Sequence, residues 1–82
     1  MSKRIGMVSI ILTNREEQIS NVSKIISDHA SIIIGRIGMP YPEKGINIIS
    51  LIINGNTDKI GSLAGKLGSI NGVLVRSVLT KT

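Results

Sequence analysis

The residues best suited to bind a ligand lie in one short segment, in which Arg36 stands between Gly35 and Gly38, and Tyr41 follows. A guanidinium and a phenol next to two glycines could together bind a small molecule that carries a carboxylate. Glycine within a strand often marks a bulge or the close approach of another group. The alternative is that Arg36 is an outward-pointing charge that protects an edge strand from aggregation. The segment predicts a ligand site and leaves the protective role open.

The sequence offers little for catalysis or metal binding. The absence of cysteine excludes disulfides, thiolate metal sites and thiol nucleophiles within this chain. The single histidine, His29, is predicted at the C-terminal end of a helix, where its role is capping or packing. Glu16 and Glu17 are adjacent on that helix and point apart, so they do not form a catalytic pair. We therefore expect a protein that is not an enzyme and that holds no metal and no cofactor.

The size and charge of the chain limit the number of domains it can form and the kinds of partner it can bind. Its 82 residues predict one domain, 1–82, with an ordered core of about 3–79. The net charge of +5 is spread over single residues, and the one aromatic residue gives nucleic-acid bases little to stack on, so nucleic acid is not the favoured partner. The rival hypothesis is nucleic-acid binding through this charge, which would weaken steeply with salt. With no signal peptide and no apolar run of 18 residues, we expect a soluble cytoplasmic protein without a membrane partner.

Two isoleucine-rich strands joined by a turn organise the chain. Residues 32–39 and 46–53 are β-branched runs that are apolar on both faces. Residues 40–45 between them are turn formers, and their two prolines are expected to end regular strand pairing. Residues 3–12 predict an interior first strand of the same apolar kind, and residues 73–79 predict the last strand.

The first predicted helix begins at Asn14, which would form a capping box with Glu17. It ends near residues 29–30. Gln18 is placed on the solvent side of this helix. The predicted buried stripe consists of Ile19, Val22, Ile25, Ile26 and His29.

The second predicted helix begins after the cap in residues 54–57 and ends at Asn71 and Gly72. Its inner stripe consists of Ile60, Leu63, Ala64 and Leu67. Three glycines on an adjacent face each cost about 0.8 to 1 kcal/mol relative to alanine. They indicate either the close approach of another backbone or a weakly packed surface helix. They are Gly61, Gly65 and Gly68.

The resulting order, β-α-β-β-α-β, predicts an α+β, ferredoxin-like fold with a four-stranded antiparallel sheet. Right-handed crossovers place both helices on the same face of this sheet. The opposite face is then bare in a single chain, although its residues are apolar. We therefore expect that a second copy covers this face or that sheets join edge to edge, in a homodimer or a homotetramer.

Three segments, 33–41, 48–58 and 63–68, give the chain a resemblance to a known family. They resemble the small stand-alone proteins classed as regulators of the iron-only hydrogenase system, and the similarity extends over about residues 4–79. The most specific part is the Gly-Arg-x-Gly-x-Pro-Tyr segment that begins at Gly35. The resemblance implies an ACT-like fold, related to the C-terminal domain of nickel-responsive repressors, and a regulatory role.

The resemblance also implies where an effector would bind. Family analogy places a small-molecule ligand near Thr13, Asn14 and Arg15 and against a neighbouring subunit, where amides at the start of a helix can receive an anionic group. The nickel ligands of the repressors are histidines and a cysteine, and residues 38–47 contain neither, so nickel sensing by that site is expected to be absent. A ribbon-helix-helix DNA-binding segment is also expected to be absent. Any effect on transcription would then require a protein partner.

Overall fold

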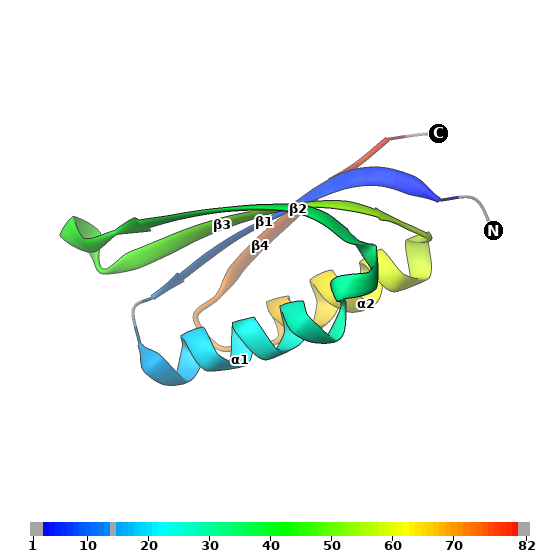
Figure 1. The fold of residues 1–82 in the computed structure, drawn as a ribbon. Coiled ribbons are helices and arrows are strands. Elements are labelled where there is room, and N and C mark those ends of the chain that lie inside the picture. The colour runs from blue at the N-terminus through cyan, green and yellow to red at the C-terminus, as the bar shows by residue number, and fades with distance from the viewer. Residues whose placement is uncertain (1–2, 14, 81–82) are drawn as a thin grey trace.

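The described chain folds into a four-stranded antiparallel sheet with two helices on one face (Figure 1). The computed structural model describes residues 3–13 and 15–80. Two short 3-10 turns, η1 (Ala30–Ile32) and η2 (Pro42–Lys44), precede the second and third strands. The longer elements follow in the order β1 (Arg4–Thr13), α1 (Glu16–Asp28), β2 (Ile33–Tyr41), β3 (Ile46–Gly55), α2 (Thr57–Gly68) and β4 (Leu74–Leu79).

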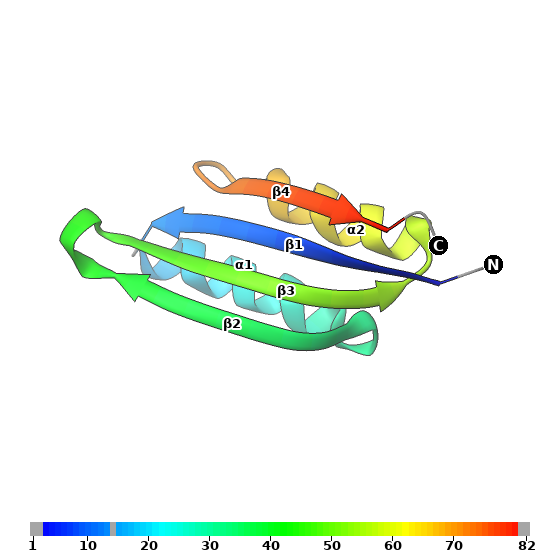
Figure 2. The ribbon, with the colours of Figure 1, turned by 90° about the horizontal axis from the view of Figure 1, so that it is seen from above.

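The strands lie in the order β2-β3-β1-β4, so β3 and β1 are the interior strands (Figure 2). β1 pairs with β3 along its whole length, from Arg4 opposite Gly55 to Thr13 opposite Ile46. β4 pairs with the other edge of β1, and β2 pairs with β3. This topology confirms the predicted α+β, ferredoxin-like fold and the interior position of the first strand.

One hydrophobic core lies between the helices and the sheet. Alternate residues of β1 and β3 point into it, because successive side chains of a strand face opposite sides. Val8, Ile10, Leu51 and Ile53 are wholly buried in this layer. The helices supply the other half of the core, and the residues that are buried there are Val22, Ile26, Ile60, Leu63 and Leu67.

The start of α1 differs from the prediction. The residue at the N-cap position is Arg15, which makes no side-chain cap hydrogen bond. Asn14, the predicted cap and a member of the expected capping box, lies outside the described residues. The predicted stripe is also rotated, because Gln18 is buried whereas Ile19 is exposed. Gln18, Val22 and Ile26 are spaced four residues apart, which places them on one face of a helix.

α2 begins as predicted and ends earlier. The Asn56 side chain accepts a hydrogen bond from the Lys59 backbone N–H at 2.8 Å, which confirms the predicted cap. The helix ends at Gly68, and the next residues form a separate turn. Gly72 does adopt the left-handed conformation, with φ of 86°, but it does so in that turn rather than at the helix end.

β2 departs from its predicted limits at both ends. It runs on through Pro40 to Tyr41, although the prolines were expected to end the pairing. β2 is an edge strand, so proline, which lacks an N–H, is tolerated there. A bulge between Ile33 and Gly35 shifts the register near its start. The sequence pattern favoured a strand that is covered on both faces. β2 is not covered in this way, because Ile34 and the six residues from Arg36 to Tyr41 are exposed.

Candidate functional site

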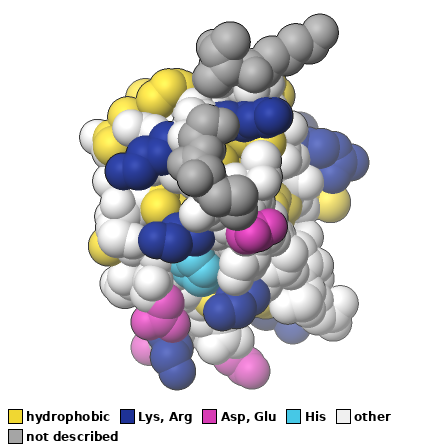
Figure 3. All heavy atoms as spheres, turned by 90° about the vertical axis from the view of Figure 1, so that its right-hand side faces the viewer, with side chains coloured by type: hydrophobic (Ala, Val, Ile, Leu, Met, Phe, Trp, Pro, Cys, Tyr) yellow, Lys and Arg dark blue, Asp and Glu magenta, His cyan; other side chains and the backbone are white. Residues whose placement is uncertain are grey.

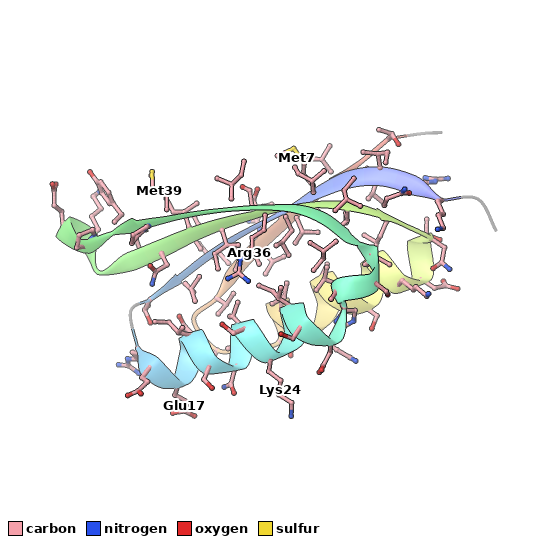
Figure 4. All side chains as sticks on the ribbon, in the orientation of Figure 1. Met7, Glu17, Lys24, Arg36 and Met39 are labelled. Atoms are coloured by element: carbon pink, nitrogen blue, oxygen red, sulfur yellow. The ribbon has the colours of Figure 1, made fainter. Side chains whose placement is uncertain are left out.

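The sheet face opposite the helices, called the open face below, is uncovered and largely apolar. Cross-strand partners share a face, so the strand register assigns residues to it. Figure 4 shows Met7 and Met39 on this side, away from the helices. Exposure ranges from 37% at Tyr41 to 70% at Val78. The large hydrophobic residues exposed on this face are Ile5, Met7, Ile11, Ile37, Met39, Tyr41, Leu74 and Val78.

A row of polar side chains crosses the middle of the open face. Ser9 and Ser50 are cross-strand partners, and their hydroxyl oxygens lie 3.2 Å apart in a hydrogen bond. Arg76 pairs with Ser9 from the edge strand β4, and its guanidinium donates to the Val75 backbone carbonyl at 2.8 Å. The chain's five acidic residues all lie in α1, η2 and α2. The sheet therefore carries no negative charge.

A shallow hollow indents one end of the open face. Its volume is about 320 Å³, and its wall is almost entirely hydrocarbon. Residues of all three of the strands β1, β3 and β4 contribute to it, including Ile5, Met7, Ile52 and Val78. Such a hollow suits the insertion of an apolar side chain from outside the chain.

A second concavity lies on the opposite side of the sheet, between α1 and the strands β2 and β3. This α1–β2 cleft has a volume of about 220 Å³. Leu12, Val22 and Ile49 form its apolar interior, and Arg36 and Gly38 line it from β2. The cleft exists because α1 packs over the interior strands and leaves the helix side of β2 uncovered.

The structure divides the predicted Arg36 site between the two faces of the sheet. Arg36 and Gly38 are paired with Leu51 and Ile49, whose side chains are in the core, so both lie on the helix side. Figure 4 shows the Arg36 side chain below the sheet, on the side of α1. Gly35 and Tyr41 are partners of Ile52 and Ile46 and lie on the open face. Arg36 and Gly38 are thus brought together, but Gly35 and Tyr41 do not join them.

The other predicted site is the loop between β1 and α1, and hydrogen bonds to the Gln18 side chain hold this loop in place. The Thr13 backbone N–H and hydroxyl both donate to the Gln18 side-chain oxygen. The Gln18 side-chain amide donates to the Asn71 carbonyl at 2.8 Å. Arg15 lines a small polar hollow beside Gln18, and Asn14 lies outside the described residues. With both Thr13 donors already used, ligand binding at this loop stays a prediction without further support.

Replacement of Gln18 by leucine is expected to destabilise the fold by about 1 to 3 kcal/mol, because the Thr13 amide and the Asn71 carbonyl lose their partner while leucine keeps the volume. The measurement is urea-induced unfolding of the Gln18→Leu variant. Asn21→Ala, an exposed position on the same helix, serves as the control and should change stability by less than about 0.5 kcal/mol. Equal urea midpoints for the two variants would show that the Gln18 hydrogen bonds do not stabilise the fold.

His29 occupies the predicted position at the C-terminal end of α1. Its Nδ1 lies 2.8 Å from the Ile25 carbonyl oxygen, and its Nε2 lies 3.5 Å from the Ser62 hydroxyl. Figure 3 views the molecule from the side where the histidine is visible, and the basic side chains there are interspersed with acidic ones. Within residues 3–13 and 15–80, no group of three or more histidine, aspartate or glutamate side chains is arranged to hold a metal. In the same residues no helix is long and apolar enough to cross a membrane.

The fold is that of an ACT-like domain. The ACT domain of GTP pyrophosphokinase from Chlorobium tepidum matches with a TM-score of 0.78 and 23% identity, over 94% of this chain and 100% of that one. The C-terminal domain of the MgtC protein from Mycobacterium tuberculosis matches with a TM-score of 0.72 and 15% identity, over 95% of this chain and 88% of that one. Both likenesses concern the fold alone.

The comparisons also assign the chain to a particular family within this fold. Residues 4–77 match the TM1266-like family, which is described as "Iron-only hydrogenase system regulator, putative". The protein TM1266 from Thermotoga maritima is 35% identical, with a TM-score of 0.95 over 98% of this chain and 100% of that one. The chain belongs to the TM1266-like family, which confirms the resemblance found in the sequence. No curated protein matches the chain.

Sequence reasoning missed two features of these surfaces. The buried position of Gln18, which allows its hydrogen bonds to two loops, could have been predicted because Gln18, Val22 and Ile26 share one helical face. The α1–β2 cleft could not, because it depends on which strands α1 covers. The uncovered open face, in contrast, follows from the apolar alternation of the strands and was anticipated.

Proposed function

We propose that this chain is a regulatory module of the iron-only hydrogenase system that assembles with copies of itself and acts by binding rather than by catalysis. Its membership of a family of regulators and its ACT-like fold support the regulatory part. The observation that carries the assembly is the open face. A folded monomer rarely exposes an apolar patch larger than about 300 to 600 Å².

A second copy of the chain is the occupant that fits the open face best. The face is apolar and carries no acidic residue, so two copies can meet on it without burying opposed or unpaired carboxylates. Among the described strand residues, its one charged side chain is Arg76, which lies on the edge strand β4 and can stay at the solvated rim of an interface. The hollow near Met7 can receive an apolar side chain of the second copy. An interface of this kind can be self-complementary, as a two-fold axis requires.

The assembly is expected to bind an effector, either a small molecule or a protein partner. Effector binding would then regulate the iron-only hydrogenase system. Effector binding can alter an assembly only through different affinities for its different states. A regulator of this kind needs no catalytic group, which agrees with the absence of a paired acid and base in the sequence.

Native mass spectrometry of freshly purified protein tests this function, because it reports the number of subunits and any retained ligand together. We expect a dimer or a tetramer at micromolar concentration. Sedimentation of a well-folded single chain at that concentration would contradict the proposal. For the regulatory part, a host strain that carries an assembly-deficient variant should show altered iron-only hydrogenase activity, and unchanged activity would count against the link.

A further inference from the structure

The α1–β2 cleft has the form of a small ligand site. Its interior is formed by Leu12, Val22 and Ile49, which are buried core residues. Gly38 lies at its β2 side, and a β-carbon built there would touch nothing within 4 Å. The glycine therefore leaves open space where any other residue would place a side chain into the cleft. The sequence keeps this side of the sheet empty beside an otherwise close-packed core.

Arg36 is the one cation among the described residues that line this cleft. Its guanidinium lies on the side of α1 (Figure 4), and it makes no hydrogen bond or ion pair with any residue in the described part of the chain. The described lining of the cleft contains no acidic residue. A guanidinium offers a planar pair of donors that matches a carboxylate, so an unpaired arginine at the mouth of an apolar space selects for an anion with a hydrocarbon body.

The geometry points to the α1–β2 cleft as the binding site for a small apolar monocarboxylate, with the carboxylate on Arg36 and the hydrocarbon part over Gly38 against Val22 and Ile49. This inference rests on the proposed regulatory function, for which it names the effector class and its place. The site differs from the loop that family analogy suggested, because it lies between the helix and the edge strand of one chain.

The size of the cleft limits the ligand. A volume of about 220 Å³ has room for about seven water-sized groups, which is less than the usual pocket of a drug-sized ligand. A branched acid of five carbons fills this space, whereas acetate leaves most of it empty. A longer chain would extend into solvent and gain little additional affinity.

The first test is a titration of the ¹⁵N-labelled protein with isovalerate, monitored by amide chemical shifts. We expect saturable shifts at Ser23, Gly38 and Ile49, with a Kd at or below the millimolar range. Isovaleramide has the same shape without the charge and should bind at least about tenfold more weakly, as should acetate, which has the charge without the hydrocarbon. Equal binding of the acid and its amide, or no saturable shift up to about 20 mM isovalerate, would overturn the inference.

Two variants of the cleft test its two halves. Arg36→Gln removes the charge at an exposed position and should weaken isovalerate binding at least about tenfold. A β-carbon at Gly38 meets nothing within 4 Å, so Gly38→Leu places a side chain into this space and should abolish binding, while urea unfolding reports that the fold is kept. Arg76→Gln removes another exposed arginine from the opposite edge and face of the sheet, and it should bind as the natural protein does. Wild-type affinity in either cleft variant, or the same loss in Arg76→Gln, would overturn the site.

Failure of this inference and failure of the proposed function can be distinguished. Native mass spectrometry reports the number of subunits without isovalerate, so assembly can be confirmed while the cleft proves empty. Binding with the expected variant pattern in a protein that remains a single chain would support the cleft and contradict the assembly.

Discussion

The Ile11→Lys variant is expected to sediment as single chains at the micromolar concentrations where we propose that the natural protein assembles. Ile11 lies on the interior strand β1, 39% exposed on the open face, with Leu74 and Ile48 as its cross-strand partners. In a symmetric interface each substitution appears twice, so two ammonium groups would be desolvated without a counter-charge, since the sheet carries no acid. We expect Kd to rise by about 100-fold or more.

The control for this experiment is Ile19→Lys. Ile19 is 38% exposed on α1, so the same residue type is replaced at the same exposure on the opposite side of the molecule. This variant should keep the natural number of subunits. Leu74→Lys provides a second test of the open face, because Leu74 is 58% exposed on the edge strand β4 and its replacement should leave the single-chain fold unchanged. The open face would be excluded as the interface if Ile11→Lys and Leu74→Lys both assemble like Ile19→Lys.

Two glycine-to-alanine substitutions are expected to change the free energy of unfolding in opposite directions. A β-carbon built at Gly6 lies 2.6 Å from the Val78 carbonyl oxygen and 2.6 Å from a methyl carbon of Leu79. Because the first of these contacts is with backbone, β4 must move away from β1, and we expect Gly6→Ala to destabilise the protein by about 1 to 3 kcal/mol. A domain of this size has a total stability of roughly 4 to 12 kcal/mol, so the loss is substantial.

Gly65→Ala, the matched variant, should stabilise the protein by about 0.8 to 1 kcal/mol, because a β-carbon at Gly65 meets nothing within 4 Å and alanine is the better helix former. Urea-induced unfolding of both variants, at several protein concentrations, provides the measurement. Destabilisation by Gly65→Ala that grows with concentration would show that another chain packs closely on α2. A neutral Gly6→Ala would show that β4 can shift at no cost.

The sequence left open why α2 contains three glycines at spacings of four and three residues. Their spacing indicated either a close backbone contact or a weakly packed surface helix. In the structure Gly61, Gly65 and Gly68 all face open space within the described chain. The spacing of glycines on a helix does not reveal which face turns outward when the neighbouring stripe is already apolar, and the position of the sheet decides it.

The predicted ligand segment shows how far residue order can lead. The sequence placed Gly35, Arg36, Gly38 and Tyr41 together because they are close along the chain. The pleat of β2 separates them, since alternate residues of a strand point to opposite faces, and the bulge at the start of β2 fixes which residue faces which way. Arg36 and Gly38 therefore share the α1–β2 cleft, whereas Tyr41 belongs to the open face.

Residue order alone was sufficient to predict the order of the elements, the ferredoxin-like topology and the presence of an apolar face that the chain's two helices cannot cover. These follow from local patterns, because alternation, turn residues and caps act over a few residues, and the crossover rule then leaves one arrangement. Three further features appear only once the chain is folded: α1 leaves the helix side of β2 bare, Gln18 joins two distant loops, and Arg36 lines a cleft without a partner among residues 3–13 and 15–80. Such features depend on how segments distant in the chain meet, and packing between them is not encoded in any single stretch.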